Sequence, residues 1–129
     1  MLIYNKKLSV CPITTHLPVK EITKNINKKI VFEKIKLIDQ FYRENFNLVP
    51  RIAVLGLNPH CESIDSFNED EKIIKPVIKS LLRNKFNISG PYPADTIFLK
   101  ENRKNFDVIV GMYHDQVLTP IKTLFEYDA

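Results

Sequence analysis

The sequence predicts an α/β fold, namely a mainly parallel sheet with flanking helices. Three short apolar runs, at residues 8–14, 52–57 and 106–112, are expected to be buried strands, and stretches with helical spacing of apolar side chains separate them. Strands that alternate with helices favour a parallel sheet, because each helix carries the chain back across the sheet before the next strand begins. Each run is followed by one of the chain's three histidines. The sequence therefore places a candidate site at the carboxyl edge of the sheet.

The first third of the chain is expected to form an edge strand and two helices. Pro12 lies inside the first strand and has no N–H to donate, which favours a place at the sheet edge. Pro18 is expected to start a helix, and Asn27 is expected to cap a second, longer one. Apolar residues spaced by three to five positions predict the buried stripe of the longer helix: Ile30, Ile35, Ile38 and Phe41 or Tyr42.

The central strand, residues 51–57, is expected to stop at a turn formed by Asn58 and Pro59. A polar loop over residues 58–68 follows it. An acidic start and helical spacing then predict a helix from residue 69 to about residue 84, which Pro76 must kink or restart.

The last third is expected to begin with a loop over residues 89–96, because this segment is too rich in proline and glycine for regular structure. This loop would hold Asp95 in place. The remaining segments are expected to be a short helix over 97–104, a strand over 106–112, a loop at 113–116 and a helix over 117–125.

Composition excludes several functional classes. The 129 residues suit one domain, and the net charge of +4 is spread along the chain, so we expect no nucleic-acid partner. The two cysteines, Cys11 and Cys61, form no disulfide framework, which indicates a cytoplasmic protein. No apolar run is long enough to cross a membrane, so no membrane partner is expected either.

The three histidines, His16, His60 and His114, are candidate ligands of a divalent metal ion. Neutral imidazoles suit zinc and similar ions, and three protein ligands with an open position are typical of a catalytic site. The alternative, in which each is an ordinary loop or capping residue, stays open because no HExxH or CxxC spacing supports a metal site.

Two carboxylates and a lysine are candidates for supporting roles. Asp95 and Asp115 could orient a ligand or a substrate, with turn capping as the alternative. Lys122 follows His114 by eight residues and could contact a phosphate, unless it is a solvated surface lysine. Cys61 is interpreted as a small loop residue rather than as a further ligand. The chain has only three glycines and no dinucleotide-binding fingerprint, so the cofactor-binding residues stay unknown.

Four segments resemble the 4-hydroxythreonine-4-phosphate dehydrogenase family of vitamin B6 biosynthesis, in the family's order and at about its spacing. They are Thr14-Thr-His-Leu-Pro18, Arg51-Ile-Ala-Val-Leu-Gly-Leu-Asn-Pro-His60, Gly90-Pro-Tyr-Pro-Ala-Asp-Thr96 and Met112-Tyr-His-Asp-Gln116. The resemblance implies a fold like that of isocitrate and isopropylmalate dehydrogenases, in a homodimer. It also implies NAD-dependent oxidation of 4-phosphooxy-L-threonine to 2-amino-3-oxo-4-phosphooxybutanoate, which decarboxylates to 3-amino-2-oxopropyl phosphate.

The resemblance also implies residue roles. The family's metal-binding histidines fall on His16, His60 and His114, at a site shared across the dimer interface, with zinc, magnesium or cobalt as the divalent ion. Its substrate-phosphate lysine falls on Lys122. Asp95 and Asp115 match acidic positions of the family motifs and are expected to play supporting roles.

The sequence also departs from the family pattern. Full members are roughly two to three times as long, beyond the usual size of one domain. Residues 1–129 are therefore expected to be a single partial domain, resembling the second, metal- and substrate-binding domain, with the N-terminal domain and the C-terminal portion absent. Val117 replaces a glycine, which could crowd a close backbone approach. Residues 61–63 replace an Ala-Gly-Glu-like turn.

The sequence leaves three functions open. The first is a fragment of the NAD-dependent dehydrogenase, which we expect to be inactive alone. The second is a non-catalytic remnant or a dimerising metal-binding module. The third, an unrelated zinc hydrolase, lacks an obvious general-base glutamate near the histidines.

Overall fold

The computed structural model describes residues 1–65 and 67–126. Residue 66, in the expected loop over 58–68, and residues 127–129, at the end of the expected domain, lie outside the described residues. The described residues form one sheet in the order β1-β4-β2-β3. Every neighbouring pair in it is parallel. The strands are β1 (Ser9–Pro12), β2 (Ile52–Leu55), β3 (Ile88–Tyr92) and β4 (Val108–Gly111). The predicted α/β class is therefore confirmed.

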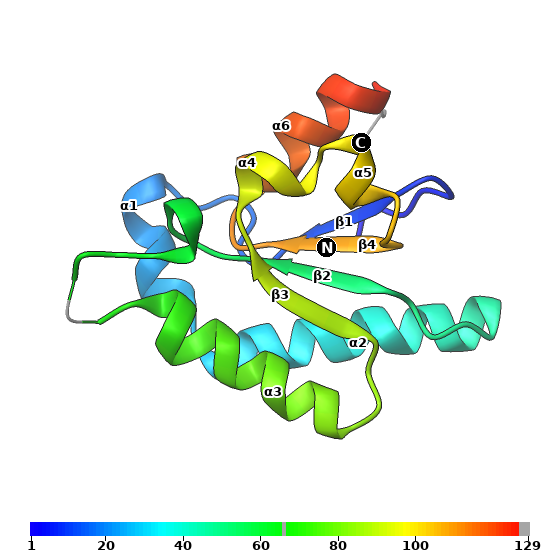
Figure 1. Ribbon diagram of the computed structural model, residues 1–129, viewed down its shortest axis with the longest axis horizontal. Coiled ribbons are helices and arrows are strands. Elements are labelled where there is room, and N and C mark those ends of the chain that lie inside the picture. The colour runs from blue at the N-terminus through cyan, green and yellow to red at the C-terminus, as the bar shows by residue number, and fades with distance from the viewer. Residues whose placement is uncertain (66, 127–129) are drawn as a thin grey trace.

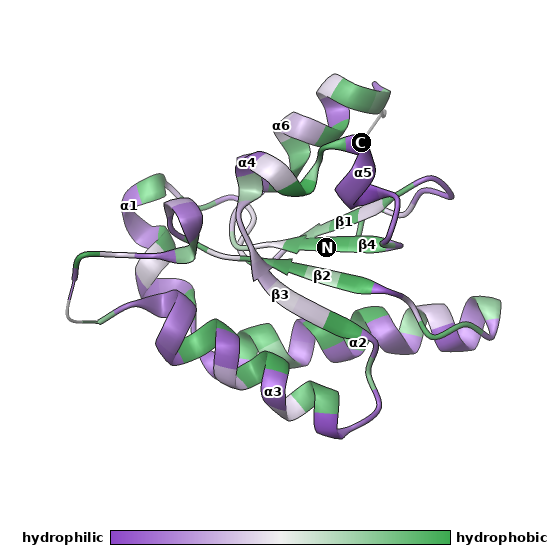
Figure 2. Ribbon diagram, viewed as in Figure 1, coloured by the Kyte–Doolittle hydropathy of each residue, from purple (hydrophilic) through white to green (hydrophobic). Residues whose placement is uncertain are grey.

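Helices cover both faces of the sheet (Figure 1). The longer helices α2 (Lys28–Phe46) and α3 (Lys75–Arg83) lie on one face, and α4 (Ala94–Ile97), α5 (Lys100–Arg103) and α6 (His114–Phe125) lie on the other. Each face has its own apolar cluster, because alternate strand residues point to opposite sides. Every residue of β1, β2 and β4 is buried, which explains why β2 and β4 are largely hydrophobic runs (Figure 2).

The first third of the chain follows the prediction closely. β1, with Pro12 at its end, is an edge strand, and the short helices α1 (Val19–Ile22) and η1 (Thr23–Asn25) follow the turn after it. The side chain of Asn27 accepts a hydrogen bond from the Ile30 N–H at 2.9 Å and so caps α2 as expected. The buried stripe differs at one place, since Val31 is buried and Ile30 only partly so.

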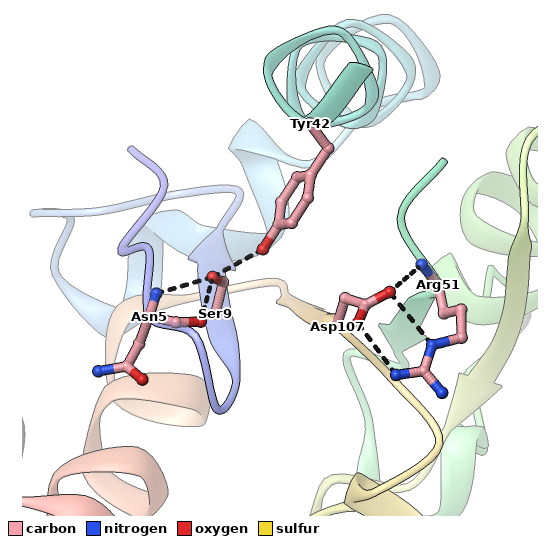
Figure 3. Close-up of polar contacts among 5 residues, drawn as sticks. All are labelled: Asn5, Ser9, Tyr42, Arg51 and Asp107. Atoms are coloured by element: carbon pink, nitrogen blue, oxygen red, sulfur yellow. Dashed lines mark hydrogen bonds and ion pairs between the residues drawn. The ribbon is translucent and has the colours of Figure 1, made fainter. Parts of the chain in front are cut away.

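Polar contacts fasten the amino ends of the strands, at the edge opposite the histidines (Figure 3). The Tyr42 hydroxyl of α2 donates to Ser9 Oγ at 2.8 Å. Asp107 accepts from the Arg51 backbone N–H at 2.8 Å and from its guanidinium at 3.1 and 3.0 Å. Burial alone would raise the pKa of Asp107, but the hydrogen bonds and charge of Arg51 outweigh it, so this pKa is lowered.

The expectation of an irregular loop over residues 89–96 is wrong for its first part, because β3 occupies Ile88–Tyr92. Two features allow a strand there. β3 is an edge strand, with β2 as its sheet neighbour. The register also shifts between Ala53 and Leu55, and a missing proline N–H is tolerated at such an irregularity. Asp95 lies in the first turn of α4 rather than in a loop.

Two helix boundaries also differ from the prediction. Residues 97–104 do not form one helix, since α4 and α5 are separated at Leu99, which has an extended backbone (ψ 141°). The loop predicted at 113–116 is wrong, because α6 begins at His114 with Tyr113 as its N-cap. Asp115 is favourable in that first turn because it faces the positive end of the helix dipole.

The helix predicted from residue 69 is present, and it contains a π-helical turn before its proline. This turn, η3 (Asp70–Ile74), runs directly into α3, which begins at Lys75 one residue before Pro76. Ile74 and Lys75 both have helical backbone angles, so the helix continues into Pro76 without a break, and irregular turns of this kind are common next to a proline.

Candidate metal and substrate site

The three histidines all emerge at the carboxyl edge of the sheet, where the sequence analysis expected them. His16 follows β1, His60 lies in the 3-10 turn η2 (Pro59–Cys61) after β2, and His114 opens α6 after β4. They share an edge because the three strands are parallel neighbours. The edge is the one toward which the strand arrows point in Figure 1.

His16 and His114 form a pair. Their ring centroids are 6.0 Å apart, with an angle of 40° between the ring planes. Two imidazoles that bind one zinc ion through nitrogen at about 2.0–2.1 Å have centroids about 5–6 Å apart. Both rings line an open hollow of about 320 Å³ together with Thr14, Thr15 and Tyr113. The spacing and the donor chemistry of this pair therefore fit a divalent ion.

The Asp115 carboxylate lies beside the His114 ring and favours one of its tautomers. The distance from His114 Nδ1 to Asp115 Oδ1 is 2.7 Å. An ionised carboxylate only accepts, so Nδ1 carries the proton and the Nε2 lone pair is left for an ion. The side chain of Asp115 is 77% exposed, so this contact adds little to stability. Its effect is to orient the ring.

His60 lies in a neighbouring hollow of about 230 Å³, lined also by Asn58, Asp95, Tyr113 and Gln116. Tyr113 lines both hollows, so they adjoin at this residue. Within residues 1–65 and 67–126, no group of three His, Cys, Asp or Glu side chains is close enough to hold a metal ion. One chain thus brings His16 and His114 together and places His60 with Asp95, and the three-histidine site stays a prediction.

Two buried side chains tie the three strand ends to one another. Thr14 Oγ1, after β1, donates to the Met112 carbonyl at 2.8 Å. Gln116 accepts from the Met112 N–H at 2.7 Å and donates to the Gly56 carbonyl at 2.8 Å. The ends of β1, β4 and β2 are therefore held together by hydrogen bonds to the backbone.

The loop that carries His60 has an unusual backbone. His60 and Cys61 have φ values of 56° and 60°, in the left-handed region that side chains other than glycine seldom adopt. Buried Asp70 accepts hydrogen bonds from the Leu57 and Asn58 N–H groups just before this turn. Burial and the charge of Asp70 raise the pKa of the Cys61 thiol, which favours its interpretation as a loop residue, since metals bind the thiolate.

Sequence reasoning missed Asp70 and Gln116 as contributors to this edge. Asp70 was counted only as part of an acidic helix start, and its contact lies 13 positions back along the chain. Gln116 has one sequence signal, its place in the His-Asp-Gln segment, but that signal does not reveal its partner 60 positions away.

Lys122 lies farther from the two hollows. It follows His114 by eight residues on α6, a rise of about 12 Å along the helix axis, and it is exposed. Val117, which replaces the family's glycine, is fully buried. A Cβ at Gly111 would lie 2.5 Å from Val117 Cγ1, so the valine packs into space that this glycine leaves open.

Comparisons with known proteins agree on one family. The model of the pyridoxal phosphate biosynthetic protein PdxA matches residues 1–129. A 4-hydroxythreonine-4-phosphate dehydrogenase from Sulfurihydrogenibium sp. is 42% identical over 96% of this chain and 38% of the relative. A D-threonate 4-phosphate dehydrogenase from Pectobacterium atrosepticum is 34% identical over 100% of this chain and 40% of the relative.

A solved structure gives the same result. The crystal structure of a 4-hydroxythreonine-4-phosphate dehydrogenase from Klebsiella pneumoniae superposes with a TM-score of 0.87, with 34% identity over 98% of this chain and 39% of that one. The chain therefore spans less than half the length of the relatives that it matches.

Proposed function

The chain belongs to the family of the pyridoxal phosphate biosynthetic protein PdxA, and from this membership we propose that it forms the metal- and substrate-binding part of an NAD-dependent dehydrogenase. The observation that carries the proposal is the pairing of His16 and His114 at the carboxyl edge of the sheet, with Asp115 orienting the second ring. This combination of two facing imidazoles and a supporting carboxylate is typical of a metal site.

The proposed substrate is a hydroxy acid with a phosphate on C4. We propose 4-phosphooxy-L-threonine, whose C3 hydroxyl would lose a proton while its C3 hydride passes to NAD. The product, 2-amino-3-oxo-4-phosphooxybutanoate, would then lose CO₂ to give 3-amino-2-oxopropyl phosphate, as befits pyridoxal phosphate biosynthesis. The related compound D-threonate 4-phosphate is a second candidate substrate, because one relative is named D-threonate 4-phosphate dehydrogenase. Lys122 would serve either substrate, since both carry the phosphate that it is proposed to contact.

The three histidines would hold the divalent ion, whether zinc, magnesium or cobalt. When bound, such an ion polarises the alcohol oxygen and stabilises the enolate that decarboxylation leaves. Asp115 keeps the proton on His114 Nδ1, so that the other nitrogen is available as a ligand. Asp95 faces the hollow that contains His60, where its carboxylate would orient the substrate.

We propose that the site is completed in a homodimer. The described residues of one chain supply a pair of imidazoles but bring no third donor to it. His16 is exposed and the hollow around the pair is open to the surface, so a second copy could reach it. Sedimentation of the chain with and without zinc tests this point, with a metal-dependent increase in mass as the expected result.

The proposed location is the cytoplasm. Both cysteines are free, as expected of a protein in a reducing compartment. Among the described residues, no helix has the length and apolar character needed to cross a membrane.

The decisive assay is NADH formation from 4-phosphooxy-L-threonine. The chain would be tested alone and together with the remaining portion of a relative, each with added zinc. Turnover in the mixture that a His114→Ala variant abolishes would support the dehydrogenase. Zinc binding without turnover in any combination would instead favour a dimerising metal-binding module. That second candidate rests on the histidine pair, which lies wholly within this chain.

A further inference from the structure

Asp70 is a buried carboxylate whose two oxygens are both used by one loop. It is fully buried, in the first turn of the π-helical segment η3. Its Oδ1 accepts the Leu57 N–H at 2.7 Å, and its Oδ2 accepts the Asn58 N–H at 3.3 Å and the Asn58 side-chain amide at 3.0 Å. Hydrogen bonds to an ionised acceptor are stronger than those between neutral groups, so the carboxylate holds the backbone of Leu57 and Asn58 firmly.

The attached loop is the one that turns from β2 to His60. Leu57 and Asn58 come directly before η2, in which His60 and Cys61 have the left-handed backbone described above. A backbone of this kind persists only when its surroundings hold it. The carboxylate supplies such a restraint at the point where the turn begins.

Asp70 and Cys61 pack closely against Gly56, which follows the last residue of β2. A Cβ added to Gly56 would lie 2.6 Å from Asp70 Oδ1 and 2.6 Å from Cys61 Sγ. The end of β2, the carboxylate and the Cys61 side chain are thus in close contact. Cys61 is the next residue after His60. A shift in the position of the Asp70 carboxylate would therefore move His60 both through the backbone of Leu57 and Asn58 and through the contact with Cys61.

We propose that Asp70 is the positioning residue of the His60 loop and sets the direction in which His60 leaves the sheet. Asp70 is also the first residue of the π-helical turn η3, and π-helical turns are frequent at functional sites. The importance of His60 as a ligand rests on the proposed function, whereas the attachment of its loop does not.

Asp70→Asn tests the proposal, because it keeps the size of the side chain but removes the charge and one acceptor oxygen. Glu71→Gln is the matched control, because it removes a charge one residue further on, at an exposed side chain that forms an ion pair with Lys75. We expect hydrogen exchange of the Leu57 and Asn58 amides to accelerate by about 10- to 100-fold in Asp70→Asn alone. The ring signals of His60 should move in its NMR spectrum while those of His16 stay in place.

Zinc affinity provides a further readout. Partners that orient a metal ligand are worth about 10- to 100-fold in affinity, so Asp70→Asn should bind zinc more weakly by that factor and Glu71→Gln should not. A wild-type chain that binds no zinc would refute the metal site of the proposed function. The exchange rates and the His60 ring signals would still decide the role of Asp70.

The wild-type chain alone can also overturn the proposal. If the Leu57 and Asn58 amides exchange as fast as those of exposed loops, the carboxylate does not hold them, and the outcome requires no variant to fold. An Asp70→Asn chain that unfolds more easily but keeps the wild-type His60 signals would show a role in stability only, and would equally refute positioning.

Discussion

Replacing Gln116 by methionine should destabilise the chain by about 2–4 kcal/mol. Methionine has a similar length and shape, so the change removes the carboxamide's two hydrogen bonds with little loss of packing. It leaves the Met112 N–H and the Gly56 carbonyl, bonded at 2.7 and 2.8 Å in the parent, without partners. Each buried backbone group that loses its partner costs about 1–3 kcal/mol, for a total of about 2–6 kcal/mol. The lower part of that range applies because Gln116 borders an open hollow that admits water.

Urea unfolding measures this loss, provided that the dependence of the free energy on urea is unchanged. The control is Gln40→Met on α2, where an exposed carboxamide donates to Glu44 at 2.8 Å. That surface change should stay within about 0.5 kcal/mol of the parent. If Gln116→Met costs no more than the control, the two backbone groups need no partner, and the argument that Gln116 ties β4 to β2 is refuted.

Three further predictions concern other parts of the chain. Asp107→Asn should lower the free energy of unfolding at pH 7, because Arg51 holds the pKa of Asp107 below its unfolded value; the difference from the parent should shrink as the pH falls below about 4 in a series of urea titrations. Asp115→Ala should weaken zinc binding by about 10- to 100-fold in calorimetry, because His114 loses its orienting partner, and should lower the free energy of unfolding by no more than about 1 kcal/mol, the size of the helix-dipole contribution. Gly56→Ala should destabilise by about 1–3 kcal/mol in urea, since its Cβ would meet two side chains at 2.6 Å.

The strands, the helices and the shared edge of the histidines could be predicted from the sequence, because each depends on a pattern that repeats along the chain. The three strands are fully buried and mainly apolar, so their position and their parallel pairing followed from the alternation of apolar runs and helical stretches. The common edge of the three histidines followed from the same reasoning. Asn27 was predictable as a helix cap because its role depends only on residues within three positions of it.

The missed elements depend on contacts that are distant in sequence. Residues 88–92 contain glycine and proline and lack a strand pattern, but the neighbouring strand β2 supplies pairing that tolerates them. The early start of α6 at His114 reflects Tyr113, whose extended backbone caps the helix without a side-chain hydrogen bond. Sequence spacing also could not predict whether His60 lies close to His16 and His114. It places all three histidines after strands, but it does not determine the direction in which each side chain points.

In the candidate site, one set of residues holds the backbone in place and a different set is available to contact a ligand. Thr14, Asp70 and Gln116 are buried, and their hydrogen bonds go mainly to backbone groups of the strand ends. His16 and His60 are exposed, and their side chains are not held in this way. The backbone of the edge is therefore ordered before any ligand arrives, and only side chains remain to be ordered by binding. Changes in the buried set should consequently alter stability and ligand affinity together, whereas changes in the exposed set should alter affinity alone.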